Sequence, residues 1–421
     1  MKPNVTKPGK EASFKFVETQ SEFFRFLIET DKSAWIGCDT EFISEGRYQP
    51  DLCLVQVSTE AGDYILDPLA IRDLTPFWER FCREDTLAVV HACRSELEFC
   101  YRAVKRLPSK IFDVQLAAAF VGLGYPLNFK SLAAQTIRVN LEKSETLTDW
   151  SRRPLLSAQL QYALQDVCYL WRIVESLQRK LDAQGRSGWF QQEMSEYVAS
   201  LQTTFVDESW RKITGPTIKT RTELATVREL WRWRRDRAIA RNTPPHRVMR
   251  DDLIVALAKR HSADPERVAV TRGLSGKPDS PWIREICGVI QKALNLPDDQ
   301  KPKMETVNYP VYKIASQLVC LLLTQYCQRR QISPSVVMTT RDVREAIAAH
   351  QGTLPTDITP RLKTGWRAEF IGEFLDNVLN GRYAMQITGE LEENPIRLID
   401  VGELEARAVF DVKETESEGD E

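Results

Sequence analysis

The sequence predicts an α/β domain followed by two small helical bundles. The first half of the 421-residue chain alternates short, strand-like apolar segments with helical patterns up to about residue 205, which is the arrangement of an α/β domain. The second half shows helical periodicity and no convincing strand before the far C-terminus. Several domains are expected at this length, because a single hydrophobic core stops growing at roughly 250–300 residues.

The elements of the α/β half are assigned from their apolar periodicity. Strands are predicted where apolar residues alternate or run continuously between turns, at residues 34–39, 52–58, 64–66 and 87–91. Helices are predicted where apolar residues recur every three or four positions, at residues 95–104, 113–120, 129–137 and 160–177.

The helices of the second half are separated by turns that contain proline or glycine, and they cover residues 223–241, 251–260, 282–294, 312–330 and 340–349. Their number favours two bundles. We therefore expect domains at residues 12–205, 218–298 and 306–385. Residues 386–421 stay unassigned, and their last ten residues are acidic and lack aromatic side chains, which predicts a disordered tail.

Charge and cysteine content exclude several classes of protein. The net charge is −2, but residues 211–260 concentrate 14 Lys and Arg residues against five Asp and Glu residues. No apolar run approaches the roughly 20 residues of a membrane span, and residues 1–10 lack the apolar part of a secretion signal. The nine cysteines occur singly, without the CxxC spacing of zinc sites. These features predict a cytoplasmic protein with reduced thiols and no membrane partner, and they identify no protein partner.

A pair of carboxylates follows the first predicted strand. Asp39 and Glu41 are two residues apart, so in an extended chain both point to the same side. Two acids brought to one point repel each other unless a cation lies between them, and hard divalent cations prefer such oxygen ligands. Taken alone, the pair also fits an ordinary strand terminus.

Two further acidic motifs lie on predicted helices. Glu96 and Glu98 belong to the segment HACRSELE, where a buried strand enters a helix; acids near a helix N-terminus are also common without a functional role. Tyr162 and Asp166 are four residues apart, which places the phenol and the carboxylate on the same helix face. A solvated surface pair is the alternative for these two.

In this order, the three motifs resemble those of the DEDDy 3′–5′ exonucleases. The segments DTEFISEGRYQPDLCLVQV, IFDVQLAAAF and LEKSETLTDWSRRPLLSAQLQYALQDVCYL resemble the ribonuclease D family over most of residues 33–175. The resemblance implies a ribonuclease-H-like fold with a mixed sheet flanked by helices. It also implies two bound Mg²⁺ or Mn²⁺ ions.

The resemblance also assigns roles to individual residues, which remain expectations at this point. The expected metal ligands are Asp39, Glu41, Glu96 and Asp166. Tyr162 is expected to orient the attacking water, since a phenol with a reference pKa near 10 is neutral at pH 7. For Asp113 two roles are equally open: contact with a metal ligand that holds it in place, and a helix N-cap.

One departure from the family concerns Glu96. The aspartate of the second family motif aligns with this glutamate, whose extra methylene extends the reach of the carboxylate by roughly 1.5 Å. Four consequences of this glutamate remain open: Glu96 binds a metal directly, it binds a metal through a water, the site prefers Mn²⁺, or the activity is weakened. Because the other motif residues are present, we expect activity to be retained.

The basic stretch of the second half resembles an HRDC domain. In residues 223–241, Arg234, Arg237 and Arg241 are spaced to form a basic line on the helix, and the segment RNTPPHRVMRDDLIVALAKR continues the resemblance. Residues 312–382, with TGWRAEFIGEFL, more faintly resemble a second HRDC-like domain. The arginines are expected to contact RNA phosphates, with a solvated helix face as the alternative.

The resemblance thus implies a 3′–5′ exoribonuclease that releases 5′-mononucleotides. The usual RNA partners of the family are tRNA precursors and other small structured RNAs. Two alternatives remain open: a DNA 3′–5′ exonuclease, and a catalytically weakened RNA-binding protein that carries Glu96 in place of aspartate.

Overall fold

The computed structural model describes residues 13–141, 149–206, 209–214, 217–304, 312–388 and 395–401. The predicted acidic tail lies outside the described residues. Two compact units are present, and the predicted α/β domain contributes to both. The first unit draws on Met1–Ile111, Glu142–Leu170 and Tyr197–Thr306. The second draws on Phe112–Leu141, Trp171–Glu196 and Val307–Glu421.

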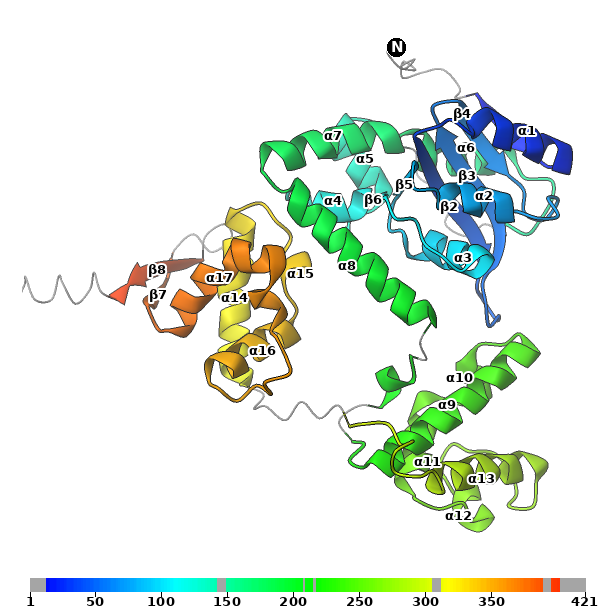
Figure 1. Ribbon diagram of the computed structural model, residues 1–421, viewed down its shortest axis with the longest axis vertical. Coiled ribbons are helices and arrows are strands. Elements are labelled where there is room, and N and C mark those ends of the chain that lie inside the picture. The colour runs from blue at the N-terminus through cyan, green and yellow to red at the C-terminus, as the bar shows by residue number, and fades with distance from the viewer. Residues whose placement is uncertain are drawn as a thin grey trace, which may run out of the picture. The chain divides into compact units, whose positions relative to one another are not determined.

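A six-stranded sheet forms the centre of the α/β part (Figure 1), with strand order β1-β4-β3-β2-β5-β6. Its strands are β1 (Phe14–Val17), β2 (Trp35–Ile43), β3 (Asp51–Thr59), β4 (Gly62–Leu66), β5 (Leu87–Val90) and β6 (Ile111–Asp113). β2 pairs antiparallel with β3 and parallel with β5, and β1 pairs parallel with β4. The sheet is therefore mixed, as predicted.

Two predicted boundaries are wrong. β2 continues to Ile43, so Asp39 and Glu41 lie inside the strand and not at its end; the partner strand β3 supplies hydrogen bonds along this extension. The predicted helix 160–177 is two helices, α6 (Ser157–Cys168) and α7 (Leu170–Ala183). The apolar spacing runs through the break, so periodicity alone did not reveal it.

Four helices of the first unit belong to the α/β part: α1 (Gln20–Thr30), α2 (Thr75–Phe81), α3 (Arg94–Val104) and α6. α6 packs across β2, β3 and β4. Its Ala163 and Leu164 join a buried cluster with Leu54 of β3 and Ile65 of β4. Burying this apolar surface fixes α6 over the sheet.

The remaining helices of the first unit form a small bundle. They are η1 (Ser209–Ile213), α9 (Arg221–Arg241), α10 (Pro245–Val248), α11 (Asp251–Lys259), α12 (Pro265–Ala269) and α13 (Pro281–Leu294). α9 begins with a capping box, in which Thr220 and Glu223 each satisfy a backbone amide of the other. Leu230, Ile254, Ile286 and other apolar side chains of α9, α11 and α13 form its core.

The second unit combines helices of the α/β part with a C-terminal bundle. The former are α4 (Val114–Phe120), α5 (Phe129–Ile137), α7 and the first half of α8 (Ser187–Val206). The bundle comprises α14 (Lys313–Arg329), α15 (Pro334–Val337), α16 (Thr340–His350), η2 (Arg361–Lys363), α17 (Gly365–Leu379) and the hairpin β7 (Tyr383–Ile387) and β8 (Ile396–Asp400).

A buried charge network ties α8 to the C-terminal bundle. The Glu193 carboxylate of α8 accepts hydrogen bonds from Trp366 Nε1 (3.0 Å) and Arg361 Nη2 (2.8 Å) and lies 2.7 Å from Arg367 Nη2. Arg367 is 2% exposed and also donates to the carbonyls of Val336 and Val337. None of the described helices is long and apolar enough to cross a bilayer.

Candidate active site

The candidate site forms where α6 lies over the middle of β2. Strand alternation places Asp39 and Glu41 on the same side of β2, and α6 carries Asp166 to that side. One carboxylate oxygen from each of these three residues lies within 4.8 Å of the other two. The structure thus brings together side chains that are separated by more than 120 positions in the sequence.

Burial, together with the neighbouring carboxylates, disfavours the charged forms of these acids. Burial and the nearby charges raise the pKa of Glu41 to about 8, and burial raises the pKa of Asp166 to about 6. The pKa of Asp39 also lies well above its usual value, because of burial and repulsion by the neighbouring carboxylates. Without a cation, the three groups therefore resist full ionisation at neutral pH. Their oxygen atoms suit a hard divalent cation, which would compensate the charge.

Tyr162 lies one helical turn before Asp166 on α6 and hydrogen-bonds to its carboxylate. Burial and the surrounding acids raise the pKa of the Tyr162 phenol above its usual value. The phenol is therefore neutral, and its hydroxyl donates a hydrogen bond to the carboxylate. The Tyr162 ring also lies 6.2 Å from that of Trp150.

Glu96 is placed differently from the other three acids. Its side chain, in the first turn of α3, is 4% exposed. Its Oε1 accepts a 2.7 Å hydrogen bond from Thr40 Oγ1. Its negative charge contributes to the raised pKa of Asp39 and Glu41, so it lies close to them. Glu96 is nevertheless not one of the residues whose oxygens come within 4.8 Å of one another.

Asp113 occupies the N-cap of α4. Its Oδ1 accepts hydrogen bonds from the amides of Gln115 (2.9 Å) and Leu116 (3.4 Å). This is one of the two roles expected for it. The other role, contact with a metal ligand, stays a prediction.

An ion pair that sequence reasoning missed holds the segment before α6. Arg153 binds both carboxylate oxygens of Asp67, at 2.6 and 2.7 Å, and donates to the carbonyl of Cys53 at 2.8 Å. Asp67 is 3% exposed. Because Asp67 follows β4 directly, this bidentate pair attaches the start of α6, and with it Tyr162 and Asp166, to the sheet. Neither residue carries a signal in the sequence, since the two are far apart.

Arg234 does not lie on a basic surface line, and this prediction is wrong. Its side chain is 5% exposed, pairs with Asp251 at 2.5 Å and donates to the carbonyl of Met249 at 2.9 Å. The reason is helical spacing: Leu230 and Ala238, four residues to either side, are fully buried and share its helix face.

Arg237 is partly covered, whereas Arg241 is exposed at the end of α9. The Arg237 guanidinium binds Glu285 and lies 5.4 and 5.3 Å from the ring centres of Trp233 and Trp282. Trp233 packs against the core of the bundle and donates a hydrogen bond to Glu285.

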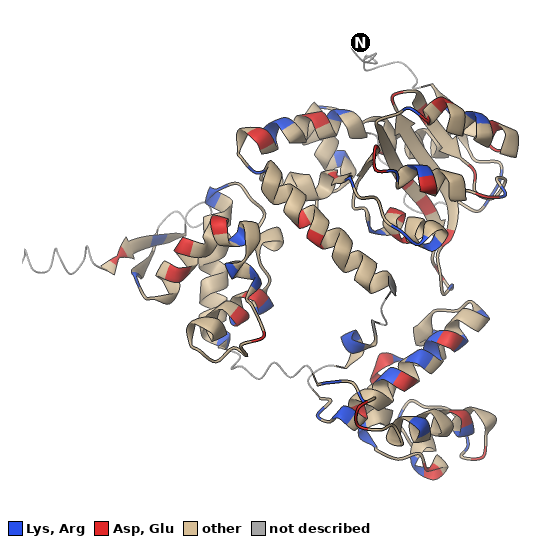
Figure 2. Ribbon diagram, viewed as in Figure 1, with Lys and Arg blue, Asp and Glu red and all other residues tan. Residues whose placement is uncertain are grey.

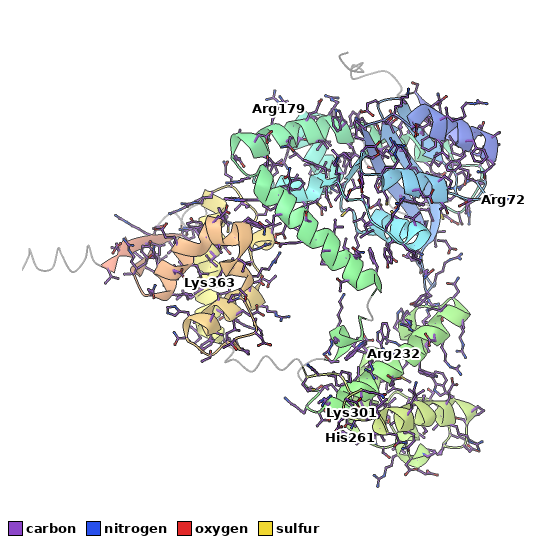
Figure 3. All side chains as sticks on the ribbon, viewed as in Figure 1. Arg72, Arg179, Arg232, His261, Lys301 and Lys363 are labelled. Carbon is purple, nitrogen blue, oxygen red and sulfur yellow. The ribbon has the colours of Figure 1, made fainter. Side chains whose placement is uncertain are left out.

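Acids interrupt the basic stretch throughout this bundle (Figure 2). Among the side chains labelled in Figure 3, Arg232 pairs with Glu229 at 3.1 Å, Lys301 with Asp298 at 2.8 Å and His261 with Glu223 at 3.0 Å. Within residues 211–260, Arg232 and Arg234 pair with acids of the same stretch, and Arg237 pairs with Glu285 from outside it, so these arginines do not form an uncompensated basic surface.

Comparisons with known proteins agree with this architecture. A family model described as a 3′–5′ exonuclease matches residues 14–182, and one described as an HRDC domain matches residues 223–290. Ribonuclease D of Nitrobacter hamburgensis is 32% identical over 356 residues, which cover 84% of this chain and 91% of that protein. Ribonuclease D of Shewanella sp. (strain ANA-3) is 29% identical over 371 residues, covering 86% and 93% of the two chains.

Among solved structures, Escherichia coli RNase D is similar over most of the chain. It is described as an exoribonuclease involved in structured RNA processing. The TM-score is 0.73 at 26% identity, and the match covers 88% of this chain and 99% of that one. Because similarity to these proteins extends through the exonuclease and HRDC regions alike, the chain belongs to the ribonuclease D family of 3′–5′ exoribonucleases.

Proposed function

We propose that the protein hydrolyses RNA 3′ ends with two divalent cations, Mg²⁺ or Mn²⁺, held by four acids: Asp39, Glu41, Glu96 and Asp166. The observation that most supports this proposal is the group of three carboxylates whose oxygens lie within 4.8 Å. Their raised pKa values indicate a charge that a cation would compensate. When bound, two such cations supply Lewis-acid stabilisation of both the attacking and the leaving oxygen in phosphodiester hydrolysis.

Tyr162 orients the attacking water in this proposal. Its raised pKa keeps the phenol protonated at neutral pH. The hydroxyl then donates to Asp166, and its oxygen retains lone pairs that accept a hydrogen bond from water. Tyr162 thereby acts by position and not as an independent base.

The proposed substrates are tRNA precursors or other small structured RNAs, shortened one nucleotide at a time to release 5′-mononucleotides. Similarity to E. coli RNase D, described as acting in structured RNA processing, supports this class. The proposed domains are the exonuclease domain at 12–205, the HRDC domain at 218–298 and an HRDC-like domain at 306–385.

RNA contact by the HRDC domain is assigned to its exposed arginines. Arg241 lies exposed in the last turn of α9, and Arg237 is partly exposed beside two tryptophan rings. Contacts to phosphates do not depend on sequence and weaken with salt. Arg241→Gln should therefore reduce the salt dependence of RNA binding without altering cleavage of a short single strand.

Degradation of an RNA with a 3′ overhang tests the activity. The purified chain is assayed with Mg²⁺, Mn²⁺ or EDTA, beside Asp39→Asn and Asp166→Asn variants that keep side-chain size. Stepwise shortening that requires metal and disappears in both variants is the expected result. If RNA binds but stays intact with each metal ion, the proposed activity is contradicted, and the chain is a catalytically weakened RNA-binding protein.

The remaining alternative, a DNA exonuclease, is tested by comparing degradation of this RNA with degradation of a DNA strand of the same sequence. The 2′-hydroxyl is the main difference that a site can recognise. Faster removal of deoxynucleotides than of ribonucleotides would favour a DNA exonuclease and contradict the proposed substrate.

A further inference from the structure

Thr40 lies between two of the acids but faces away from them. Because successive strand residues alternate sides, the Thr40 side chain leaves β2 on the side opposite to Asp39 and Glu41. It is 6% exposed. A hydroxyl buried in this way requires a hydrogen-bond partner.

The topology brings α3 to that side of β2. Along β2, the residues that pair with β5 are Trp35–Gly37, and the chain turns from β5 into α3. α3 then packs against the later part of β2, where the Phe42 and Phe99 rings are 5.5 Å apart. The first turn of α3, with Glu96, consequently lies beside Thr40.

The bond between the two residues is short and buried. Thr40 Oγ1 donates to Glu96 Oε1 at 2.7 Å, and both side chains are less than one-tenth exposed. This distance is typical of a hydroxyl that donates to a charged carboxylate. Such bonds are stronger than those between neutral groups and also restrict the orientation of the acceptor.

Glutamate needs such a restraint more than aspartate does. It has one more rotatable bond, and holding a glutamate side chain in a single rotamer costs more conformational entropy. Its carboxylate also reaches roughly 1.5 Å further from the backbone. An acid that serves a metal site must be held close to its productive geometry.

We propose that Thr40 is a positioning residue that fixes the Glu96 carboxylate beside the Asp39–Glu41–Asp166 group and so compensates for the longer side chain. This inference rests on the proposed metal-dependent function. It makes the middle residue of the Asp-Thr-Glu segment part of the site, although its side chain faces away from the three acids. It also predicts that the contributions of Thr40 and Glu96 are coupled.

The coupling follows from the geometry. In Glu96→Asp the carboxylate is withdrawn by one methylene, so the 2.7 Å bond to Thr40 is lost unless the backbone moves. Removing the Thr40 hydroxyl should then matter when residue 96 is glutamate and not when it is aspartate. A double-mutant cycle measures this difference.

The test uses the full chain as wild type, Thr40→Val, Thr40→Ser, Glu96→Asp and the double variant Thr40→Val/Glu96→Asp. Valine keeps the shape of threonine and removes the donor, whereas serine retains it. The first readout is the Mn²⁺ dissociation constant, which is measured from the electron paramagnetic resonance signal of the unbound ion. The second is the Mn²⁺ concentration that gives half-maximal RNA cleavage, and thermal unfolding in EDTA reports folding.

We expect Thr40→Val to weaken Mn²⁺ binding about 10-fold or more, Thr40→Ser to stay within about threefold of wild type, and Thr40→Val to have little effect in the Glu96→Asp background. If the valine variant does not fold, Thr40→Cys takes its place, because the cysteine side chain is close in size to that of threonine and its thiol is only a weak hydrogen-bond donor. Equal losses in both backgrounds, or no loss in either, would overturn the inference. A wild-type chain that binds no Mn²⁺ would overturn the proposed function and the inference with it.

Discussion

Replacing Glu41 by glutamine should stabilise the metal-free protein while abolishing metal-dependent cleavage. The pKa of Glu41 is about 8 in the folded chain against an ordinary value of 4.5. A raised carboxyl pKa means that the folded state holds a proton that the unfolded state has released. Stability is therefore lost as the pH rises from about 4.5 towards 8.

The magnitude follows from this difference. In the unfolded chain Glu41 has a pKa of 4.5, and pH 7 lies about 2.5 units above it. At 1.36 kcal/mol per unit, the free energy of unfolding is lowered by about 3 kcal/mol at this pH. Because the side chain is only half-buried, solvent screening reduces the expected gain to about 2–3 kcal/mol. At pH 5 the same variant should gain less than about 1 kcal/mol.

Hydrogen exchange in EDTA measures the effect within the exonuclease sheet. Amides of β2 and β3 exchange through unfolding of the sheet, so a gain of 2–3 kcal/mol slows their exchange about 30- to 150-fold at pH 7. Glu45→Gln, at an exposed position just after β2, is the matched control and should change nothing. Exchange in Glu41→Gln that is unchanged, or slowed equally at pH 5 and pH 7, would refute the conclusion that burial and the neighbouring carboxylates raise the pKa of Glu41.

Four further predictions concern the site and its supports. Mn²⁺ binding to the wild-type chain should strengthen at least 10-fold from pH 6 to pH 8, because Asp166 and Glu41, with pKa values of about 6 and 8, must release protons to bind a cation; a flat titration profile would contradict this. Tyr162→Phe should lower kcat about 10-fold or more and leave Mn²⁺ binding within about threefold, since the phenol orients water; an equal loss in both would indicate a metal-binding role. Arg153→Met should destabilise the exonuclease sheet by about 3–5 kcal/mol, because it leaves the Asp67 carboxylate buried without its ion pair. Arg152→Met is its control, since Arg152 is 84% exposed, and similar melting of the two variants would speak against the ion pair. Arg367→Met should accelerate hydrogen exchange in α14 and α17 through the loss of its buried bonds to Glu193 and two carbonyls, whereas Arg382→Met, at a 54% exposed side chain, should not.

Local features of the sequence predicted many of the elements, but α1, α8 and α17 were not among the predicted helices. The apolar alternation of residues 52–58 corresponds to β3, and residues 129–137 coincide with α5. Short elements such as β1 and β6, with four and three residues, were missed because so few positions cannot establish a period. The end of β2 was misplaced because its polar residues pair with β3, a contact that the strand itself does not encode.

The sequence by itself determined the candidate acids, the α/β-then-helical order and the family resemblance, because these depend on residue types and their spacing. Only the tertiary structure decided which groups meet. It brought Asp166 to Asp39 and Glu41, bonded Glu96 to Thr40 and buried Arg234 against Asp251. The physical reason is that hydrogen bonds and charge repulsion act over a few ångströms, and the packing of α3 and α6 on the sheet sets those distances between residues far apart in the chain.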